Sequence, residues 1–355
     1  MTPVDLSRSV VRALRRAVED GELPAGVVVP ERVVVERTRP GGVGDYASPV
    51  AFGVAKGAGV APRGVAEVLA PRLAGLAGVE RVEITGAGFL NFVLAESSVG
   101  ELVRGIRAGG AASYGLAPEG CAIPETVDAP AGALRERVVH AAVQRIVSGQ
   151  GVERVEGAGG ERAPAVRSAR IAPVAKRDGD VVAVYGAGAA VWAMLGVPAA
   201  ETPVFSASLL VQDESSELFR VRYACDRARA LTRNAAQLGF QGEPGELGEP
   251  GEPGEPGDVH GVGVLLGALR DHPLVLEAAA HHRAPERLVR QLVVIADALL
   301  DFQYHVLPKG DEKPSAAHRA RLALAEAAGT VLAGGLALLG IDVPDHHHLH
   351  HHHHL

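Results

Sequence analysis

The sequence predicts two folded regions of different class, an α+β domain at the N-terminus and an all-helical bundle toward the C-terminus. Residues 1–110 mix helical periodicity with short β-rich runs, whereas residues 201–345 place their apolar side chains at helical spacing. The stretch between them has few regular signals. A length of 355 residues, 47% of them hydrophobic and 22% charged, suffices for two or three domains with buried cores.

The N-terminal region begins with a predicted amphipathic helix. Leu6, Val10, Leu14 and Val18 recur every four residues and form one apolar stripe. The arginines of this segment fall together on another face, and they are Arg8, Arg12 and Arg15. Two interpretations of this basic face remain open, a solvated surface and a contact for phosphate groups.

Strand and turn signals follow this helix. The run 27–37 is rich in β-branched residues, and 79–84 and 89–94 predict two strands around the glycine-rich turn 86–88. Helical and strand signals therefore coexist in one domain, which we expect to extend over residues 1–110.

One helix of the C-terminal region is especially clear. The cluster Asp213–Glu217 offers N-cap chemistry, and apolar residues then recur at three and four, at Leu218, Val221, Cys225, Ala228, Leu231, Ala235 and Leu238. The polar positions of this helix carry many arginines, namely Arg220, Arg222, Arg227, Arg229 and Arg233. So dense a positive face predicts either solvation or contact with phosphates, although a general preference for Arg over Lys in a GC-rich genome explains part of it.

Composition limits the classes of function. The formal net charge of −7 excludes a general attraction for polyanions, so we expect no DNA binding. The two cysteines, Cys121 and Cys225, form no Cys-x-x-Cys motif, so we expect neither a disulfide framework nor a metal site. Short apolar runs interrupted by charge predict no membrane span, no signal peptide and a cytoplasmic location.

Two low-complexity segments stand apart from the predicted domains. Residues 242–257 repeat a Gly-Glu-Pro triplet with the period of collagen but without its length. We interpret this run as an acidic, extended and unconstrained surface loop, with a negative spacer or a docking tag as alternatives. The His-rich tail 346–355 is either a purification tag or a loose ligand for divalent metal ions.

Several segments carry a family resemblance, and in chain order they are Gly44–Ala51, Arg81–Phe92, Leu218–Arg227, Arg319–Leu324 and Leu336–Ile341. Together they resemble the N-terminal additional domain and the C-terminal helical anticodon-binding domain of arginyl-tRNA synthetases. The resemblance implies that Phe89 and Asn91 hold the D-loop of a tRNA by aromatic packing and amide hydrogen bonds.

The same resemblance implies an anticodon contact on the helix that begins near Leu218. Two tyrosines and an arginine of the family fall on Arg220, Tyr223 and Arg227 of this chain. One tyrosine is therefore replaced, although an Arg plane also stacks on bases. We add Arg233 to this predicted tRNA-binding set because it belongs to the same arginine-rich face.

The middle region, residues 111–200, resembles only a remnant of the family's catalytic domain. The two histidines and the glycine of the ATP-binding signature would fall on Arg135, Val138 and Arg137, which removes donors for the phosphates. Lys176 lies in a vestige of the second ATP-binding loop. About thirty residues separate the end of the predicted helix near Val147 from Lys176, room for one βαβ unit where the family needs several. No other catalytic motif is evident, so we predict no catalytic residue, no cofactor and no enzyme activity.

Three functions remain open at this point. The first is a non-catalytic arginyl-tRNA synthetase paralogue that binds tRNA, most simply arginine tRNA, through its two terminal domains. The second is a protein-interaction or regulatory module that reuses these domains, with a partner such as a full-length synthetase. The third is residual arginine-tRNA ligase activity, which the vestigial Lys176 loop keeps formally open.

Overall fold

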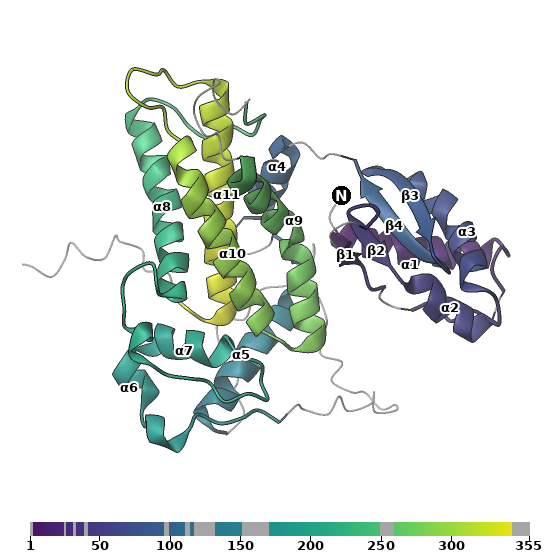
Figure 1. The fold of residues 1–355 in the computed structure, drawn as a ribbon, viewed down its shortest axis with the longest axis horizontal. Coiled ribbons are helices and arrows are strands. Elements are labelled where there is room, and N and C mark those ends of the chain that lie inside the picture. The colour runs from purple at the N-terminus through teal and green to yellow at the C-terminus, as the bar shows by residue number, and fades with distance from the viewer. Residues whose placement is uncertain are drawn as a thin grey trace, which may run out of the picture. The chain divides into compact units, whose positions relative to one another are not determined.

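The chain divides into two compact units, Met1–Ser98 and Val99–Leu355 (Figure 1). The structure is a computed structural model, and the residues that it describes are 3–24, 26–30, 33–38, 42–95, 99–110, 114–116, 132–150, 170–248 and 259–342. The division falls before helix α4 (Val99–Gly109), which packs against helix α11 (Ala316–Leu339) of the second unit. The sequence boundary at residue 110 had placed that helix in the first domain.

Within its described residues, the first unit consists of a four-stranded antiparallel sheet and three helices. The strand order is β1-β2-β4-β3. The strands are β1 (Glu36–Arg37), β2 (Tyr46–Ser48), β3 (Val79–Thr85) and β4 (Phe89–Leu94), and the helices are α1 (Pro3–Glu19), α2 (Val50–Ala58) and α3 (Pro62–Ala74). Helix α3 packs against β3 and β4, while α1 and α2 pack against α3. The predicted α+β class and the β3–β4 hairpin are confirmed, but the β-rich run 27–37 supplies only the two residues of β1.

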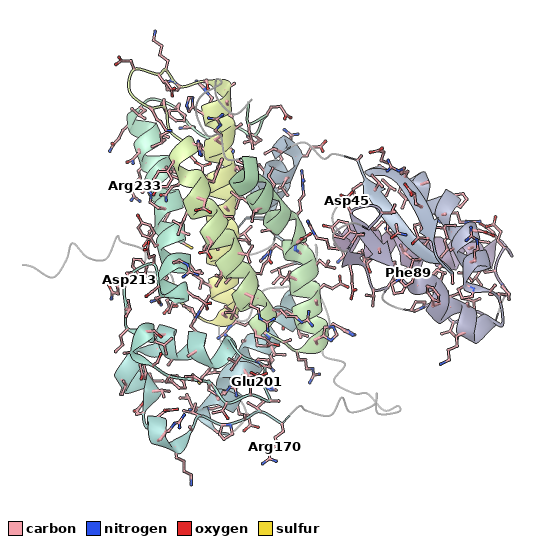
Figure 2. All side chains as sticks on the ribbon, viewed as in Figure 1. Asp45, Phe89, Arg170, Glu201, Asp213 and Arg233 are labelled. Carbon is pink, nitrogen blue, oxygen red and sulfur yellow. The ribbon has the colours of Figure 1, made fainter. Side chains whose placement is uncertain are left out.

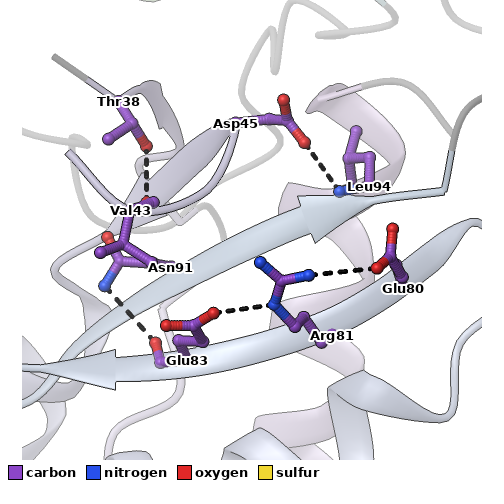
Figure 3. Close-up of polar contacts among 8 residues, drawn as sticks. All are labelled: Thr38, Val43, Asp45, Glu80, Arg81, Glu83, Asn91 and Leu94. Carbon is purple, nitrogen blue, oxygen red and sulfur yellow. Dashed lines mark hydrogen bonds and ion pairs between the residues drawn. The ribbon is translucent and has the colours of Figure 1, made fainter. Parts of the chain in front are cut away.

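The segment Gly44-Asp45-Tyr46 connects strand β2 to strand β4 through contacts that the sequence alone does not reveal. Gly44 has φ +77°, and a Cβ at this position would lie 2.7 Å from the carbonyl oxygen of Phe92. Asp45 donates its backbone N–H to that same oxygen at 2.8 Å and accepts the Leu94 N–H on Oδ2 at 2.9 Å (Figure 3). Tyr46 is 4% exposed and lies opposite Phe92 in the register. The motif therefore joins β2 to β4 where a side chain at residue 44 would not fit.

In its described residues the second unit contains helices and no strand. Its α-helices are α4, α5 (Leu134–Gly149), α6 (Val181–Tyr185), α7 (Ala187–Leu195), α8 (Glu217–Gln237), α9 (Val259–His282), α10 (Glu286–Phe302) and α11, and its 3-10 turns are η1 (Lys176–Asp178), η2 (Ala207–Leu209) and η3 (Gln303–His305). Helices α8, α10 and α11 pack against one another, α9 packs against α10, and α5 contacts α7, α9 and α11. The predicted all-helical class is confirmed.

The core of the bundle forms along α8 and α11. The predicted apolar stripe of α8 is buried as far as Ala235, but Leu238 follows the helix and is 52% exposed, so its place in the core was predicted wrongly. Cys225 lies in this stripe at 2% exposure, and burial raises the pKa of its thiol to about 12, so the thiol stays protonated. Cys121 lies outside the described residues.

Small residues let α11 approach its neighbours closely. A Cβ at Gly329 would lie 2.6 Å from the Ala228 side chain, and one at Gly335 would lie 2.4 Å from a methyl group of Leu292. By length and composition α11 is the one described helix that could cross a membrane. Because 72% of the apolar stretch of α11 is buried inside the bundle, this helix is better explained as a core helix.

The first part of the Gly-Glu-Pro run is docked on the bundle, contrary to the prediction of an unconstrained loop. Arg107 of α4 donates two 3.1 Å hydrogen bonds to the carbonyl of Gly242, and Arg321 of α11 donates one of 3.0 Å to the carbonyl of Leu247. Leu247 also packs against the core. Residues 242–248 therefore form an ordered strap, whereas 249–257 and the His-rich tail lie outside the described residues.

Candidate nucleic-acid interface

The predicted tRNA contacts lie on two elements, one in each unit. Phe89 and Asn91 belong to β4, whereas Arg220, Tyr223, Arg227 and Arg233 belong to α8. Each set is a separate candidate surface.

Phe89 is presented at the start of β4 by the tight turn of the hairpin. Its side chain is 43% exposed, and its ring centroid lies 4.8 Å from that of Phe52 of α2 at an interplanar angle of 56°. Gly88 precedes it with φ +139°, and a Cβ there would lie 2.9 Å from the backbone of Pro62. The turn and α2 thus hold a half-exposed aromatic ring in place, which suits stacking on an unpaired base.

Asn91 lies beside Phe89 in sequence but is committed to the sheet. The residue is 5% exposed, and its Nδ2 donates to Thr85 Oγ1 at 2.7 Å and to the carbonyl oxygens of Glu83 and Phe89 at 3.4 Å. Figure 3 shows the contact with Glu83. In this structure the Asn91 amide holds the hairpin together instead of facing a ligand, so only Phe89 of the pair is presented to solvent.

Charge on this strand pair is largely compensated. Arg81 donates from Nε to Glu83 at 2.8 Å and from a terminal nitrogen to Glu80 at 3.1 Å (Figure 3). The negative charges of these two carboxylates exceed the single positive charge of Arg81. A base held at Phe89 would therefore be held by stacking, with little help from positive charge on β3.

Helix α8 is positioned by local capping at its N-terminus. The Ser216 side chain accepts the N–H of Phe219 at 3.4 Å, which confirms the predicted N-cap. Just before it, Asp213 accepts both the N–H and the hydroxyl of Ser215, and these hydrogen bonds hold the pKa of its carboxyl below the usual value. The start of α8 is thus fixed by its own sequence.

Arg220 lies inside a tether between α8 and α10. Its guanidinium contacts both carboxylate oxygens of Asp297, at 2.7 and 3.3 Å, and also donates to the carbonyl of Glu214 at 2.7 Å. The bond to Asp297 raises its pKa. Each of its three guanidinium nitrogens therefore makes a contact within the second unit, so Arg220 ties α8 to α10.

Tyr223 is the best presented of the predicted residues on α8. It is 43% exposed, and its ring stacks on Phe219 with centroids 5.7 Å apart and planes within 7°. Arg227, one turn further, is half-buried and donates from Nε to Gln303 of η3. Arg233 is exposed without an ion-pair partner among the described residues and points away from the bundle in Figure 2.

The predicted arginine face is therefore divided. Arg220 and Arg227 lie toward α10 and η3, and Arg229 lies 3.5 Å from Asp226. Between these edges the outer surface of α8 carries the stacked ring pair. Phe219 was missed as a site residue, although its spacing of four from Tyr223 is the signal that would have found it. Tyr304 of η3, 67% exposed beside Gln303, was also missed.

The middle region contains a buried arginine where the resemblance placed a histidine of the ATP site. Arg135 of α5 is fully buried, and its guanidinium donates to carbonyl oxygens of the segment that runs from 172 to 201. The acceptors are Ala172 at 2.7 Å, Pro198 at 2.9 Å, Met194 and Ala199 at 3.3 Å, Val197 at 3.4 Å, and Glu201. Burial lowers the pKa of Arg135, partly offset by Glu286 and Glu201.

The other positions of the ATP signatures do not form a phosphate site either. Val138 is half-buried and packs into the hydrophobic core, while Arg137 and Lys176 are exposed. His140 is half-buried. Within the described residues no group of three His, Cys, Asp or Glu side chains could hold a metal ion.

Two family models match the chain in the predicted order. The arginyl tRNA synthetase N terminal domain matches residues 5–94, and the DALR anticodon binding domain matches residues 221–346. The two ends of the chain are similar to the N-terminal and anticodon-binding domains of arginyl-tRNA synthetases. Residues 95–220 fall in neither match.

Individual relatives agree with these matches. The arginine–tRNA ligase of Frankia alni is 51% identical over 121 residues, and that of Micrococcus luteus is 44% identical over 109 residues. These alignments cover 34% and 30% of this chain but only 22% and 20% of the relatives. Thermus thermophilus arginyl-tRNA synthetase aligns over 97% of this chain and 100% of its own with TM-score 0.58 and 14% identity, a likeness of fold alone.

Proposed function

We propose that this chain is a non-catalytic relative of arginyl-tRNA synthetase that binds tRNA, with arginine tRNA as the first candidate, in the cytoplasm. The observation that carries the proposal is the stacked pair Phe219–Tyr223 on the outer surface of α8, in a domain related to anticodon-binding domains. Exposed Arg233 lies further along the same helix, about 15 Å from Tyr223 along the axis. Aromatic rings suit stacking on unpaired bases, and a cation at that spacing suits a phosphate of a neighbouring nucleotide.

The proposal that the chain is non-catalytic rests on the side chains found in the middle region. A guanidinium buried among carbonyl oxygens stands where a histidine would meet the triphosphate, and Val138 packs into the core. Neither side chain can donate to ATP from these positions. Arginine-dependent exchange of pyrophosphate into ATP is expected to stay at background, and measurable exchange would refute this part of the proposal.

Binding is tested with total tRNA at fixed salt, followed by sequencing of the bound fraction, because salt sets the amount of nonspecific binding. Enrichment of arginine acceptors is expected. Tyr223→Ala is expected to weaken binding about 5- to 150-fold, from about 1–3 kcal/mol per stacked base. Arg287→Ala, at an exposed arginine of α10 outside this surface, serves as the control.

A protein partner is the competing outcome. If bulk tRNA shows no enrichment and Tyr223→Ala changes nothing, the tRNA proposal is refuted. Capture of a full-length synthetase by the same α8 surface, with loss of capture in Tyr223→Ala, would then support the interaction module that the acidic net charge of −7 favours.

A further inference from the structure

Helix α1 carries an unneutralised strip of arginines that the two predicted contacts do not use. Arg8, Arg12, Arg15 and Arg16 are all exposed. At 100° per residue they fall within about one quarter to one third of the helix circumference. The opposite side of α1 is fully buried by its apolar stripe, so the strip faces away from the core of the first unit.

The strip differs from the other arginines of this unit in its partners. Arg63 pairs with Glu67 at 3.1 Å, and Arg81 pairs with Glu80 and Glu83. Arg72 forms ion pairs with two acidic residues that follow α1, Asp20 at 2.6 Å and Glu22 at 2.9 Å. No described residue forms an ion pair with any arginine of the strip. Asp20 and Glu22 are therefore used elsewhere. Glu19 lies on the same exposed face, four residues after Arg15, but forms no ion pair with a described residue, so positive charge still exceeds negative charge on this face.

Keeping these four charges together is unfavourable for the free protein. Like charges at i,i+4 on a helix, as at Arg8 and Arg12 or Arg12 and Arg16, destabilise it by about 0.2–0.5 kcal/mol per pair. The chain as a whole is acidic, with a formal net charge of −7. A local cationic strip on an acidic protein is suited to a polyanion that approaches this face.

We propose that the α1 strip binds the phosphate backbone of RNA, as a third contact in addition to those at Phe89 and on α8. The inference rests on the proposed function, since tRNA is the polyanion that the two related domains support. Guanidinium groups donate to phosphate oxygens in forked pairs and read no sequence, so the strip adds affinity and orientation without choosing the tRNA.

The test is the salt dependence of tRNA binding by the full chain. In the variant Arg8→Gln/Arg12→Gln/Arg15→Gln, glutamine keeps the helix and removes three charges. Losing three phosphate contacts is expected to reduce the slope of log K against log salt by about 2–3, and affinity at 0.1 M salt by roughly 100-fold. The enrichment of particular tRNAs is expected to remain unchanged.

A control with the same loss of charge separates local from global effects. Arg177→Gln/Arg287→Gln/Arg290→Gln removes three exposed arginines of the second unit. An unchanged slope in the α1 variant, or an equal change in this control, would overturn the α1 inference while leaving the proposed function standing. If the unaltered chain binds no tRNA, the proposed function itself fails. Binding of phosphatidylserine vesicles that is lost in the α1 variant, with tRNA binding unaffected, would assign the strip to a lipid surface instead.

Discussion

Replacing Arg135 by leucine is expected to be the most damaging single change in the middle region. The substitution removes a fully buried guanidinium and leaves carbonyl oxygens without donors. Two close acceptors depend on this side chain, the carbonyl oxygens of Ala172 at 2.7 Å and of Glu201, whereas the Pro198 carbonyl also accepts the backbone N–H of Glu201 at 2.9 Å. At about 1 kcal/mol for each acceptor left unpaired, the low end of the range, the loss is about 2 kcal/mol. For a unit of this size that corresponds to a fall in Tm of roughly 4–8 °C.

The chain contains its own reporter for this change. Trp192 is the single tryptophan, is 4% exposed and lies in α7, two residues before Met194, whose carbonyl Arg135 also contacts. Denaturant unfolding followed by Trp192 fluorescence therefore measures the affected region. Arg177→Leu is the control, since that side chain is 84% exposed and 3.8 Å from Asp178. If Arg135→Leu lies within 0.5 kcal/mol of the unaltered chain, a value typical of surface sites, the argument from buried carbonyls is refuted.

Three further changes follow from single positions. Arg283→Gly is expected to stabilise the chain by about 1 kcal/mol and raise Tm, because Arg283 is the one described non-glycine residue with positive φ (50°), and an unchanged or lower Tm would contradict this. His272 is 2% exposed and stacked on Tyr114, and burial lowers its pKa to about 4. Below about pH 6.5 His272 therefore binds a proton in the unfolded chain but not in the folded chain. The free energy of unfolding falls as pH drops from 6.5 toward 4, by roughly 2 kcal/mol at pH 5. In denaturant titrations, His272→Phe should flatten this dependence on pH. Gly44→Ala is expected to destabilise the first unit by at least about 2 kcal/mol, because Gly44 has φ +77° and a Cβ there would meet the Phe92 carbonyl. Faster hydrogen exchange along β4 would reveal this loss of stability. Unaltered exchange would count against the close contact.

The sequence predicted those features that depend on neighbouring residues. The helix at α8, its Ser216 cap and the buried position of Cys225 follow from spacing along one segment, and the β3–β4 hairpin follows from two short runs around a glycine turn. Each of these features depends on residues close together in the sequence, so the spacing of apolar, capping and turn residues is enough to predict it.

Features that depend on distant partners were predicted poorly. Arg220 was predicted as a base contact from the family resemblance, and its ion pair with Asp297, 77 residues away in sequence, could not be predicted from its own segment. Helix α4 was assigned to the wrong side of the domain boundary for a similar reason, because its partner α11 lies near the other end of the chain. No periodicity within one segment reports such pairings.

The strap at 242–248 shows how a low-complexity repeat acquires one fixed register. Glycine recurs every third residue, and Cβ atoms at Gly242 and Gly248 would meet Ala323 and Ala317 of α11 at 3.0 and 2.8 Å. The repeat alone would allow the chain to shift by a triplet. Leu247 replaces proline in a single triplet, packs against the core and places its carbonyl on Arg321, so this departure from the repeat fixes the register.

Arg135 also explains why single reversions should not recreate an ATP site. Arg135→His would restore the residue type that the family resemblance expects there, yet an imidazole offers at most two donors where six carbonyl oxygens now share a guanidinium. Val138, also in α5, would still pack against the hydrophobic core. We therefore expect Arg135→His to lower the unfolding midpoint nearly as much as Arg135→Leu while arginine-dependent pyrophosphate exchange stays at background. Gain of exchange without loss of stability would mean that the carbonyl cluster is dispensable and that the middle region retains a nucleotide site. The expected result would mean that α5 and the segment 172–201 are now held together by the very position at which the family would hold ATP.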